Sequence, residues 1–363
     1  MKIRAAVSRK DTRSPELADV ELKEIRNCDV LVRIVACGVC RTDVDAHLGT
    51  IRVPKPIVLG HEGAGVVEAI GADVTTLKQG DHVVLSGSSC GQCRNCKRDL
   101  PTYCRDAARR NFGGLRSDGS TYITANGSRV FGSFFGQSSF AQYAIAEERT
   151  AVKVPKDLAL SLLAPLGCGV TTGAGAVFNA LAPSSNDSIA IFGVGAVGLS
   201  AVMAANVLGL RRIIAIDQWA ERLAVARELG ATDAFNASET DIENDIRKLC
   251  PDGVDFALNT TSSAALMTTA VQCLAMRGVA GFVSAPHETW MAPLVTLLGG
   301  GRTLRAVLGG DASPHRLIGA LIEFYRRGQF PIDRLIKFYS FSQIAEAFDA
   351  LSSGRAIKPV LLS

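Results

Sequence analysis

The stretch from Ser188 to Leu210, SIAIFGVGAVGLSAVMAANVLGL, constrains the fold more than any other part of the chain. Its twenty-three residues carry no charge, a length that suffices for a membrane-spanning helix. The interior argues against that interpretation: β-branched residues come first, three glycines follow within six residues, and an alanine-rich run ends the stretch. This order predicts a buried strand, a tight turn and a buried helix.

The turn has the spacing G-x-G-x-x-G, formed by Gly193, Gly195 and Gly198, and Asp217 ends the next predicted strand, RRIIAID. In a dinucleotide site the first glycine makes the turn, the second lets the backbone approach the pyrophosphate, and the third lets helix and strand pack closely. The helix N-terminus offers free N–H groups to the phosphates. We expect Asp217 to bind the adenosine ribose, which favours NAD over NADP; a glycine turn that serves packing alone is the alternative.

The chain is long enough for two domains, since 363 residues exceed the usual size of one core. Between about residues 170 and 308, predicted strands alternate with helices, which indicates an α/β domain with a parallel sheet. Residues 1–155 hold short Val/Ile runs broken by Gly, Pro and Asp, which predict a mainly antiparallel, barrel-like domain. The predicted domain limits are 1–169 with 309–363, and 170–308. The strands predicted in the α/β domain are SIAIFGV, RRIIAID, GVDFALNT and GVAGFVSA, and its helices include WAERLAVARELG and SAALMTTAVQCLAM.

The net charge of +4 equals the excess of basic over acidic residues in one segment, from Cys90 to Arg110, which has six basic residues and two acidic ones. A zinc-ribbon module that binds nucleic acid is one interpretation. The segment has a single aromatic residue, Tyr103, to stack on a base, so we expect a solvated surface and no nucleic-acid partner. The N-terminal residues lack the apolar run of a secretory signal. We therefore expect a cytoplasmic protein without a membrane partner, whose ten cysteines are thiols or metal ligands.

Two sets of residues are candidate zinc ligands. Four cysteines with the spacing C-x2-C-x2-C-x7-C predict a tetrahedral site, and because four thiolates leave no open position, this site is expected to be structural. A catalytic zinc needs three protein ligands and one open place, and two thiolates with one imidazole form one such set. The structural ligands are Cys90, Cys93, Cys96 and Cys104, and the catalytic candidates are Cys40 in CGVCRTD, His61 in GHEGAG and Cys168 in GCGVTTG.

These motifs, in this order and with the closing segment AIKPVLL, resemble the zinc-dependent medium-chain alcohol dehydrogenases over essentially the whole chain. The segments NFGG, SDGS and FFGQSSFAQYA look most like the aryl-alcohol (benzyl alcohol) dehydrogenases. The resemblance implies a Rossmann-type cofactor domain at 170–308, a GroES-like catalytic zinc-binding domain formed by the two other ranges, NAD, and two zinc ions per chain. It also implies a homo-oligomer built by continuing the cofactor-domain sheet across a twofold axis, with a dimer favoured over a tetramer.

The resemblance also suggests roles for residues around the two sites. Asp43 resembles the carboxylate that orients His61, Thr42 the hydroxyl that takes the alcohol proton, and Glu62 a carboxylate that approaches the metal during ligand exchange. Asp45 stands where many family members have a proton-relaying histidine, and an aspartate holds a proton poorly at neutral pH. The remaining positions are Arg41 and Lys358 for the pyrophosphate, Arg222 for the ribose, Thr172, Val197 and Val283 for the nicotinamide, and Phe134 and Phe135 for the substrate pocket.

Together these features predict reversible oxidation of a primary aromatic or allylic alcohol by NAD. A thiol-dependent formaldehyde dehydrogenase of the same architecture, acting on an S-hydroxymethyl thiol held by Arg109 and Arg110, is the alternative within the enzymes.

Overall fold

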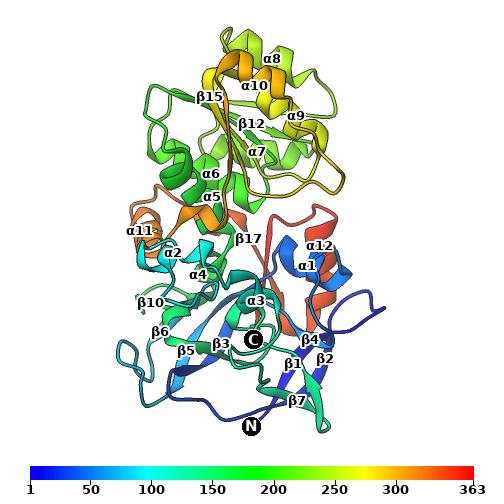
Figure 1. Ribbon diagram of the computed structural model, residues 1–363, viewed down its shortest axis with the longest axis vertical. Coiled ribbons are helices and arrows are strands. Elements are labelled where there is room, and N and C mark those ends of the chain that lie inside the picture. Colours follow the sequence, from blue (N-terminus) through cyan, green and yellow to red (C-terminus); the bar gives the residue numbers. More distant parts are fainter. The chain divides into compact units, whose positions relative to one another are not determined.

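The computed structural model describes residues 1–363, which form two compact units (Figure 1). Unit 1 comprises Met1–Cys168, Ser313–Gly319 and Ile336–Ser363, and unit 2 comprises Gly169–Ala312 and Ala320–Leu335. The predicted range 309–363 differs from unit 1 at two places, because residues up to Ala312 and the segment Ala320–Leu335 belong to unit 2. The second of these places includes the second half of α11 (Pro314–Arg326).

Unit 2 is built on a parallel sheet of six strands in the order β13-β12-β11-β14-β15-β16. Counted along the chain this is the order 3-2-1-4-5-6 of dinucleotide-binding sheets, in which the ligand lies where the order reverses, here between β11 and β14. The strands are β11 (Ser188–Phe192), β12 (Arg212–Asp217), β13 (Asp233–Asn236), β14 (Val254–Asn259), β15 (Leu274–Phe282) and β16 (Thr303–Ala306).

The helices of unit 2 cover the sheet, as the alternation in the sequence predicts (Figure 1). Every residue of β11 is buried, which explains its unbroken apolar sequence: a central parallel strand has helices on both faces. The helices are α5 (Gly169–Gly175), α6 (Ala196–Val207), α7 (Ala220–Glu228), α8 (Ile242–Leu249), α9 (Ala264–Gln272) and α10 (Leu294–Gly300).

One boundary prediction is wrong. The sequence SAALMTTAVQCLAM predicts a helix to Met276, but α9 ends at Gln272 and β15 begins at Leu274. The N–H of Val254 donates to the carbonyl of Cys273 at 2.9 Å, so the residues from Cys273 on pair with β14 as a strand and do not continue the helix. Helix propensity is a weak preference, and strand pairing in a buried sheet overrides it here.

Unit 1 contains two sheets, in the orders β4-β1-β2-β7-β8 and β10-β6-β5-β3-β18-β17, and β9 also pairs with β3. All pairings are antiparallel except that of β17 with β18. The strands are β1 (Lys2–Ser8), β2 (Glu16–Leu22), β3 (Asp29–Gly38), β4 (Ile57–Val58), β5 (Glu62–Ile70), β6 (His82–Leu85), β7 (Ile123–Ala125), β8 (Ser128–Val130), β9 (Tyr143–Glu147), β10 (Ala151–Val154), β17 (Ile336–Ser340) and β18 (Lys358–Leu362).

The last part of the chain returns to unit 1, where β18 fills the place between β3 and β17 and α12 packs against α1 (Figure 1). The predicted combination of a parallel α/β sheet with a mainly antiparallel domain is therefore confirmed. The helices of unit 1 are α1 (Arg41–Leu48), α2 (Arg94–Lys97), α3 (Ala107–Phe112), α4 (Leu160–Leu163) and α12 (Ile344–Ser352).

No helix taken singly has the length and apolar character needed to cross a membrane; only the bent pair 160–167 and 169–181, taken together, reaches both. The uncharged stretch that begins at Ser188 forms strand β11, a turn and the twelve-residue helix α6, as predicted.

Candidate active site and metal centres

The three predicted catalytic zinc ligands converge in unit 1, although they are far apart in sequence. Cys40 lies between β3 and α1, His61 precedes β5, and Cys168 follows a 3-10 turn. Their ligand atoms and a carboxylate oxygen of Glu62 all lie within 4.8 Å of one another. His61 is fully buried, and its Nε2 atom has no hydrogen-bond partner. A zinc ion bound by two sulfurs and one imidazole nitrogen fits this donor set and would satisfy the orphaned nitrogen.

Asp43, on the first turn of α1, holds this cluster together through its side chain. One carboxylate oxygen accepts a hydrogen bond from the backbone N–H of Cys40 at 2.9 Å. The other accepts from the N–H of Gly60 at 3.0 Å and lies 2.9 Å from Nδ1 of His61. This contact fixes the imidazole with Nε2 free to bind a metal, which is what the predicted role of Asp43 requires.

The two thiols of the catalytic cluster contact each other and affect each other's pKa. A hydrogen bond with Cys168 holds the pKa of the Cys40 thiol well below its usual value, and the same contact raises the pKa of Cys168. Lys358 contacts the Glu62 side of the cluster: its Nζ donates to both oxygens of Glu62, at 2.8 and 2.9 Å. Burial opposes the charge of Lys358, but the Glu62 carboxylate outweighs it, so the pKa of the lysine is raised.

Lys358 is predicted to contact the pyrophosphate of NAD, but in the structure it is buried and paired within the protein. Its side chain is 2% exposed, and Nζ also donates to the carbonyl of Val39. A contact with a pyrophosphate requires Lys358 to give up this pairing. Arg41 is exposed and forms an ion pair with Asp45 at 3.0 Å, so two residues with separate predicted roles contact each other. The pyrophosphate and proton-relay roles remain predictions.

Aromatic rings surround the imidazole of His61. The ring of Phe135 stacks on it, with centroids 4.4 Å apart, and the ring of Phe134 meets it edge-on at 5.6 Å. Phe134 is fully buried, whereas Phe135 is half-buried, so of the two predicted pocket residues only Phe135 offers surface to a substrate. Phe112, which the sequence interpretation did not include, packs edge-on against Phe135 at 5.2 Å.

The four cysteines of the second set, which we call the cysteine lobe (residues 90–104), also bring their sulfurs within 4.8 Å of one another. Backbone N–H groups point at these sulfurs: that of Cys90 donates to Cys104, and that of Cys93 donates to Cys90. Hydrogen bonds from the backbone of Cys96 and Arg105 lower the pKa of Cys93 to about 6. Burial, by contrast, raises the pKa of Cys104 to about 11. Four sulfurs within 4.8 Å of one another form the donor set of a tetrahedral zinc, so the ion fits here as well.

The glycine turn of unit 2 has the geometry that a dinucleotide needs. Gly193 has a φ of +84°, and a Cβ on Gly198 would lie 1.9 Å from the carbonyl oxygen of Gly193. Above Gly195, by contrast, an added Cβ would meet only a guanidinium nitrogen of Arg222, at 4.0 Å. The backbone is thus open on the side where a pyrophosphate would lie, and the residues fit NAD.

Asp217 holds this turn in place. Its two carboxylate oxygens accept from the N–H groups of Val194, at 2.8 Å, and of Trp219, at 3.0 Å. Arg222 lies 4.0 Å from the carboxylate. The sequence interpretation assigned Asp217 to the ribose; its bracing of the turn is an additional role.

Thr172, Val197 and Val283, the residues predicted to contact the nicotinamide, are half-buried members of the same unit.

Comparison with known proteins decides the family. The family profile named alcohol dehydrogenase GroES-like domain matches residues 26–156, and the profile named zinc-binding dehydrogenase matches residues 196–326. A geraniol dehydrogenase from Castellaniella defragrans is 46% identical over 338 residues, which are 92% of this chain and 90% of the relative. The chain belongs to the zinc-dependent medium-chain alcohol dehydrogenase family.

Two solved structures of this alcohol dehydrogenase family match the whole chain and 99% of their own length. One is an alcohol dehydrogenase zinc-binding domain protein from Burkholderia ambifaria, with 45% identity and a TM-score of 0.97. The other is benzyl alcohol dehydrogenase from Acinetobacter calcoaceticus, with 41% identity and a TM-score of 0.96. The predicted family, fold class and enzyme type are therefore confirmed, and zinc and a nicotinamide cofactor come with the family.

Two residues near the site were missed by the sequence interpretation. Gln137 is fully buried within the aromatic segment FFGQSSF, and Tyr122 is 2% exposed. The only signal that points to Gln137 is an amide between phenylalanines, because a polar group that is buried needs partners. Cys28, outside both candidate clusters, is an exposed thiol.

We expect about two zinc ions per chain, one at each cluster, and the two clusters respond differently to substitution. Cys168→Ser removes a catalytic ligand and lowers the zinc content to about one per chain with little loss of stability. Cys104→Ser removes the structural ion, whose binding contributes to folding, and lowers the melting temperature of unit 1 as well. Metal analysis by atomic emission and thermal unfolding measure both effects. The exposed Cys28→Ser is the control, and loss of zinc in that variant would contradict the assignment.

Proposed function

We propose that the protein reversibly oxidises a primary aromatic or allylic alcohol to the aldehyde, with hydride transfer to NAD. The observation that carries this proposal is the half-buried ring of Phe135, stacked on the imidazole of a candidate zinc ligand at 4.4 Å. A flat apolar wall beside the metal ligands favours a flat apolar alcohol. The relatives that are named for geraniol, an allylic alcohol, and for benzyl alcohol support the same class.

The catalytic zinc would be held by Cys40, His61 and Cys168, and the cofactor by the glycine turn. When bound, zinc supplies Lewis acidity at the alcohol oxygen and NAD accepts the hydride. Asp43 keeps the imidazole in the tautomer that leaves Nε2 free. The carboxylate of Asp217 would repel a 2′-phosphate, which favours NAD over NADP.

Thr42 is our candidate for the group that takes the alcohol proton. It is half-buried on the first turn of α1, and its hydroxyl lies 3.9 Å from the sulfur of Cys40. The next step of the relay is less suited to Asp45, because its carboxylate is ion-paired with Arg41 at 3.0 Å. The Nε of Arg41 donates to one oxygen of this carboxylate, which makes Asp45 less available as the next group of the relay.

The proposed roles of Thr42 and Asp45 predict an order of effects. Thr42→Val removes the hydroxyl at nearly constant volume and should slow hydride transfer about 100-fold or more, the usual contribution of a positioned proton acceptor. Asp45→Asn should slow it less than about 10-fold. Single-turnover formation of NADH measures the step directly. The reverse order would reject Thr42 as the proton acceptor.

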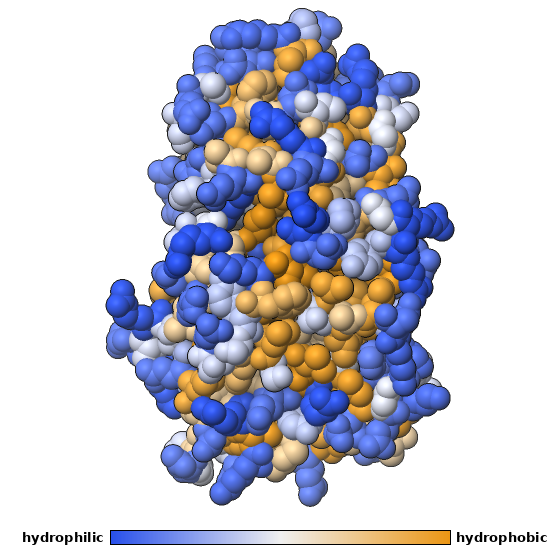
Figure 2. Space-filling model, turned by 180° about the vertical axis from the view of Figure 1, so that it is seen from behind, coloured by the Kyte–Doolittle hydropathy of each residue, from blue (hydrophilic) through white to orange (hydrophobic).

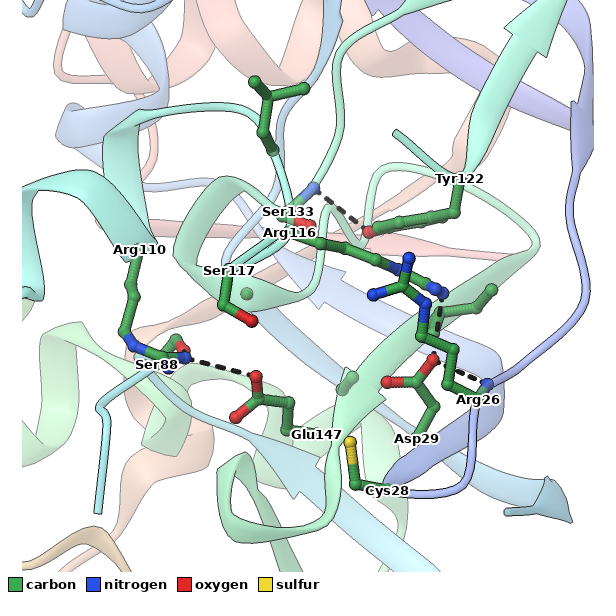
Figure 3. Close-up of a pocket in the computed structure, with 14 residues that line it drawn as sticks. Arg26, Cys28, Asp29, Ser88, Arg110, Arg116, Ser117, Tyr122, Ser133 and Glu147 are labelled. Carbon is green, nitrogen blue, oxygen red and sulfur yellow. Dashed lines mark hydrogen bonds and ion pairs between the residues drawn. The ribbon is translucent and has the colours of Figure 1, made fainter. Parts of the chain in front are cut away.

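The thiol-dependent formaldehyde dehydrogenase is disfavoured by the partners of the two arginines that it needs. Arg110 is paired with Glu147 at 3.1 Å, and Arg109 donates to the carbonyl of Ser117. Arg110 and Glu147 line a cavity of about 60 Å³, in which Arg116 is paired with Asp29 as well (Figure 3). Glu147 thus neutralises Arg110, and Asp29 neutralises Arg116 in the same cavity. Of the two arginines that the alternative needs, only Arg109 keeps a guanidinium charge without an acidic partner for an anionic thiol adduct.

A substrate panel with NAD tests the proposed function. We expect kcat/KM for benzyl alcohol and geraniol to exceed that for ethanol by about 100-fold or more, since each buried CH₂ contributes about 0.8 kcal/mol. Absorbance of NADH gives the rates. Faster turnover of formaldehyde with glutathione than of benzyl alcohol would favour the alternative enzyme, and equal rates with ethanol would contradict the aromatic pocket.

We also propose a homodimer in which the sheet of unit 2 continues across a twofold axis. β16 is an edge strand, and unpaired edge strands are open to pairing with another chain. Apolar side chains are exposed nearby in sequence, among them Val295 at 86% and Leu298 at 75%. On the face shown in Figure 2, apolar side chains also reach the surface of the protein between polar ones. A tetramer would need a second interface. The absence of nucleic-acid partners and the cytoplasmic location remain predictions.

The dimer proposal predicts the effect of a charge in α10. Leu298→Asp should shift the solution mass from about twice the chain mass of 38.3 kDa towards that of one chain, because it buries a carboxylate in the interface. Light scattering after size exclusion measures the mass. Leu48→Asp, at an exposed leucine of α1 in unit 1, is the matched control and should leave the mass unchanged. A wild-type mass of one chain would contradict the proposal.

A further inference from the structure

The segment from Ser133 to Ser139, which we call the aromatic loop, carries unusual backbone strain. Ser133, Phe135 and Ser138 have φ values of 54°, 51° and 56°, in the left-handed region that residues other than glycine avoid. Each such residue costs about 1–3 kcal/mol and persists only where its surroundings impose it. The contacts that impose this conformation therefore identify what the loop is built to hold.

The side chain of Gln137 makes the main contacts between the loop and the catalytic metal ligands. Its Nε2 donates to the carbonyl of His61 at 3.0 Å and to that of Ser86 at 3.4 Å. Its Oε1 accepts from the N–H of Gly63 at 3.1 Å and from the hydroxyl of Ser139 at 2.7 Å. The amide thus uses both donors and both lone pairs, and the reverse orientation would set its N–H groups against the N–H of Gly63.

These contacts hold the backbone on both sides of Glu62. The carbonyl of His61 and the N–H of Gly63 are the groups that Gln137 binds, so the peptide units that carry the histidine and the glutamate are fixed together. Gly63 allows this approach: a Cβ there would lie 2.2 Å from the hydroxyl of Ser139. Gln137 is fully buried, so water does not compete for its amide.

The far side of the loop is held by Tyr122. Its hydroxyl accepts from the N–H of Ser133 at 3.0 Å and donates to the carbonyl of Gln137 at 3.2 Å (Figure 3 shows the first contact). Tyr122 therefore joins the start of the aromatic loop to the residue that binds the His61 segment. The same conformation seats the ring of Phe135 on the imidazole.

We propose that Gln137 is a positioning residue of the catalytic zinc centre: its amide fixes the backbone around Glu62 and, with the aromatic loop, the orientation of the His61 ring. The inference rests on the proposed function, since it takes His61 as a zinc ligand. Only an amide of this length supplies an acceptor for Gly63 and a donor for His61 at once. Gln137 does not itself need to touch the substrate.

The test compares Gln137→Met, which keeps the length and removes the polar atoms, with Gln142→Met. Gln142 lies five residues further on and is exposed, and its side chain binds only the N–H of Arg4. Loss of zinc to a chelator, followed with a colorimetric zinc indicator, separates the two ions by rate. Loss of a partner of a metal ligand commonly lowers metal affinity about 10–100-fold, so we expect Gln137→Met to release the catalytic zinc faster by up to about that factor, with zinc in the cysteine lobe unchanged.

Two further measurements make the result specific. In the cobalt-substituted protein, the visible bands of the catalytic site should shift in Gln137→Met and stay as in the wild type in Gln142→Met. If Gln137→Met does not fold, Ser139→Ala removes only one contact of Oε1 and should give a smaller acceleration of zinc loss in the same direction.

The outcomes separate the two proposals. If the wild-type protein holds zinc only in the cysteine lobe, the proposed function fails and the inference fails with it. If the wild type holds both ions, and zinc loss and cobalt bands in Gln137→Met and Ser139→Ala equal those of the wild type, only the role of Gln137 is overturned. If Gln142→Met changes zinc loss as much as Gln137→Met, the effect is not specific and the inference is likewise rejected.

Discussion

The carboxylate of Asp43 is the contact on which the catalytic cluster depends. It is completely buried, and a buried charge is stable only when hydrogen bonds replace its lost hydration. Here the N–H groups of Cys40 and Gly60 and the ring of His61 supply those bonds, each worth about 1.5–3 kcal/mol when the partner is charged. The hydrogen bonds that the Asp43 carboxylate needs therefore bring Cys40, which precedes α1, close to His61, which follows it. A metal ion would complete an arrangement that the protein already maintains.

The two candidate metal centres differ in how far apart their ligands lie in the sequence. In the cysteine lobe, four ligands lie within fifteen residues, and local backbone N–H groups hold the sulfurs. In the catalytic cluster, Cys168 lies more than a hundred residues beyond Cys40 and His61, so the fold of unit 1 is needed to bring the ligands together. Four protein ligands saturate a zinc ion, which fits a structural role. Three protein ligands leave one coordination position open for a substrate.

Features that depend on local spacing could be predicted from the sequence. The glycine turn, the cysteine lobe and the strand–helix alternation each follow from residues close together in the chain. Lys358 shows the limit: its type and position suggested a phosphate contact, but its pairing with Glu62 joins residues separated by 296 positions. Gln137 is a second case, because its four partners come from three separate segments. The end of α9 was misplaced for the related reason that strand pairing at Cys273 overrode a local helix preference.

The position of β18 has a consequence for the order in which the protein is made. Between β3 and β17, this strand closes the larger sheet of unit 1 and brings in Lys358, the cation that pairs with Glu62. On the ribosome, residues 1–168 and all of unit 2 are synthesised before residue 358. Domains commonly fold as they appear, N-terminal segments first, so unit 2 is able to close while the sheet of unit 1 still lacks an inner strand. Until that strand docks, the carboxylate of Glu62 has no lysine to face and the catalytic pocket is unfinished. A late-arriving strand thus makes assembly of the reactive centre one of the last events in the maturation of the chain.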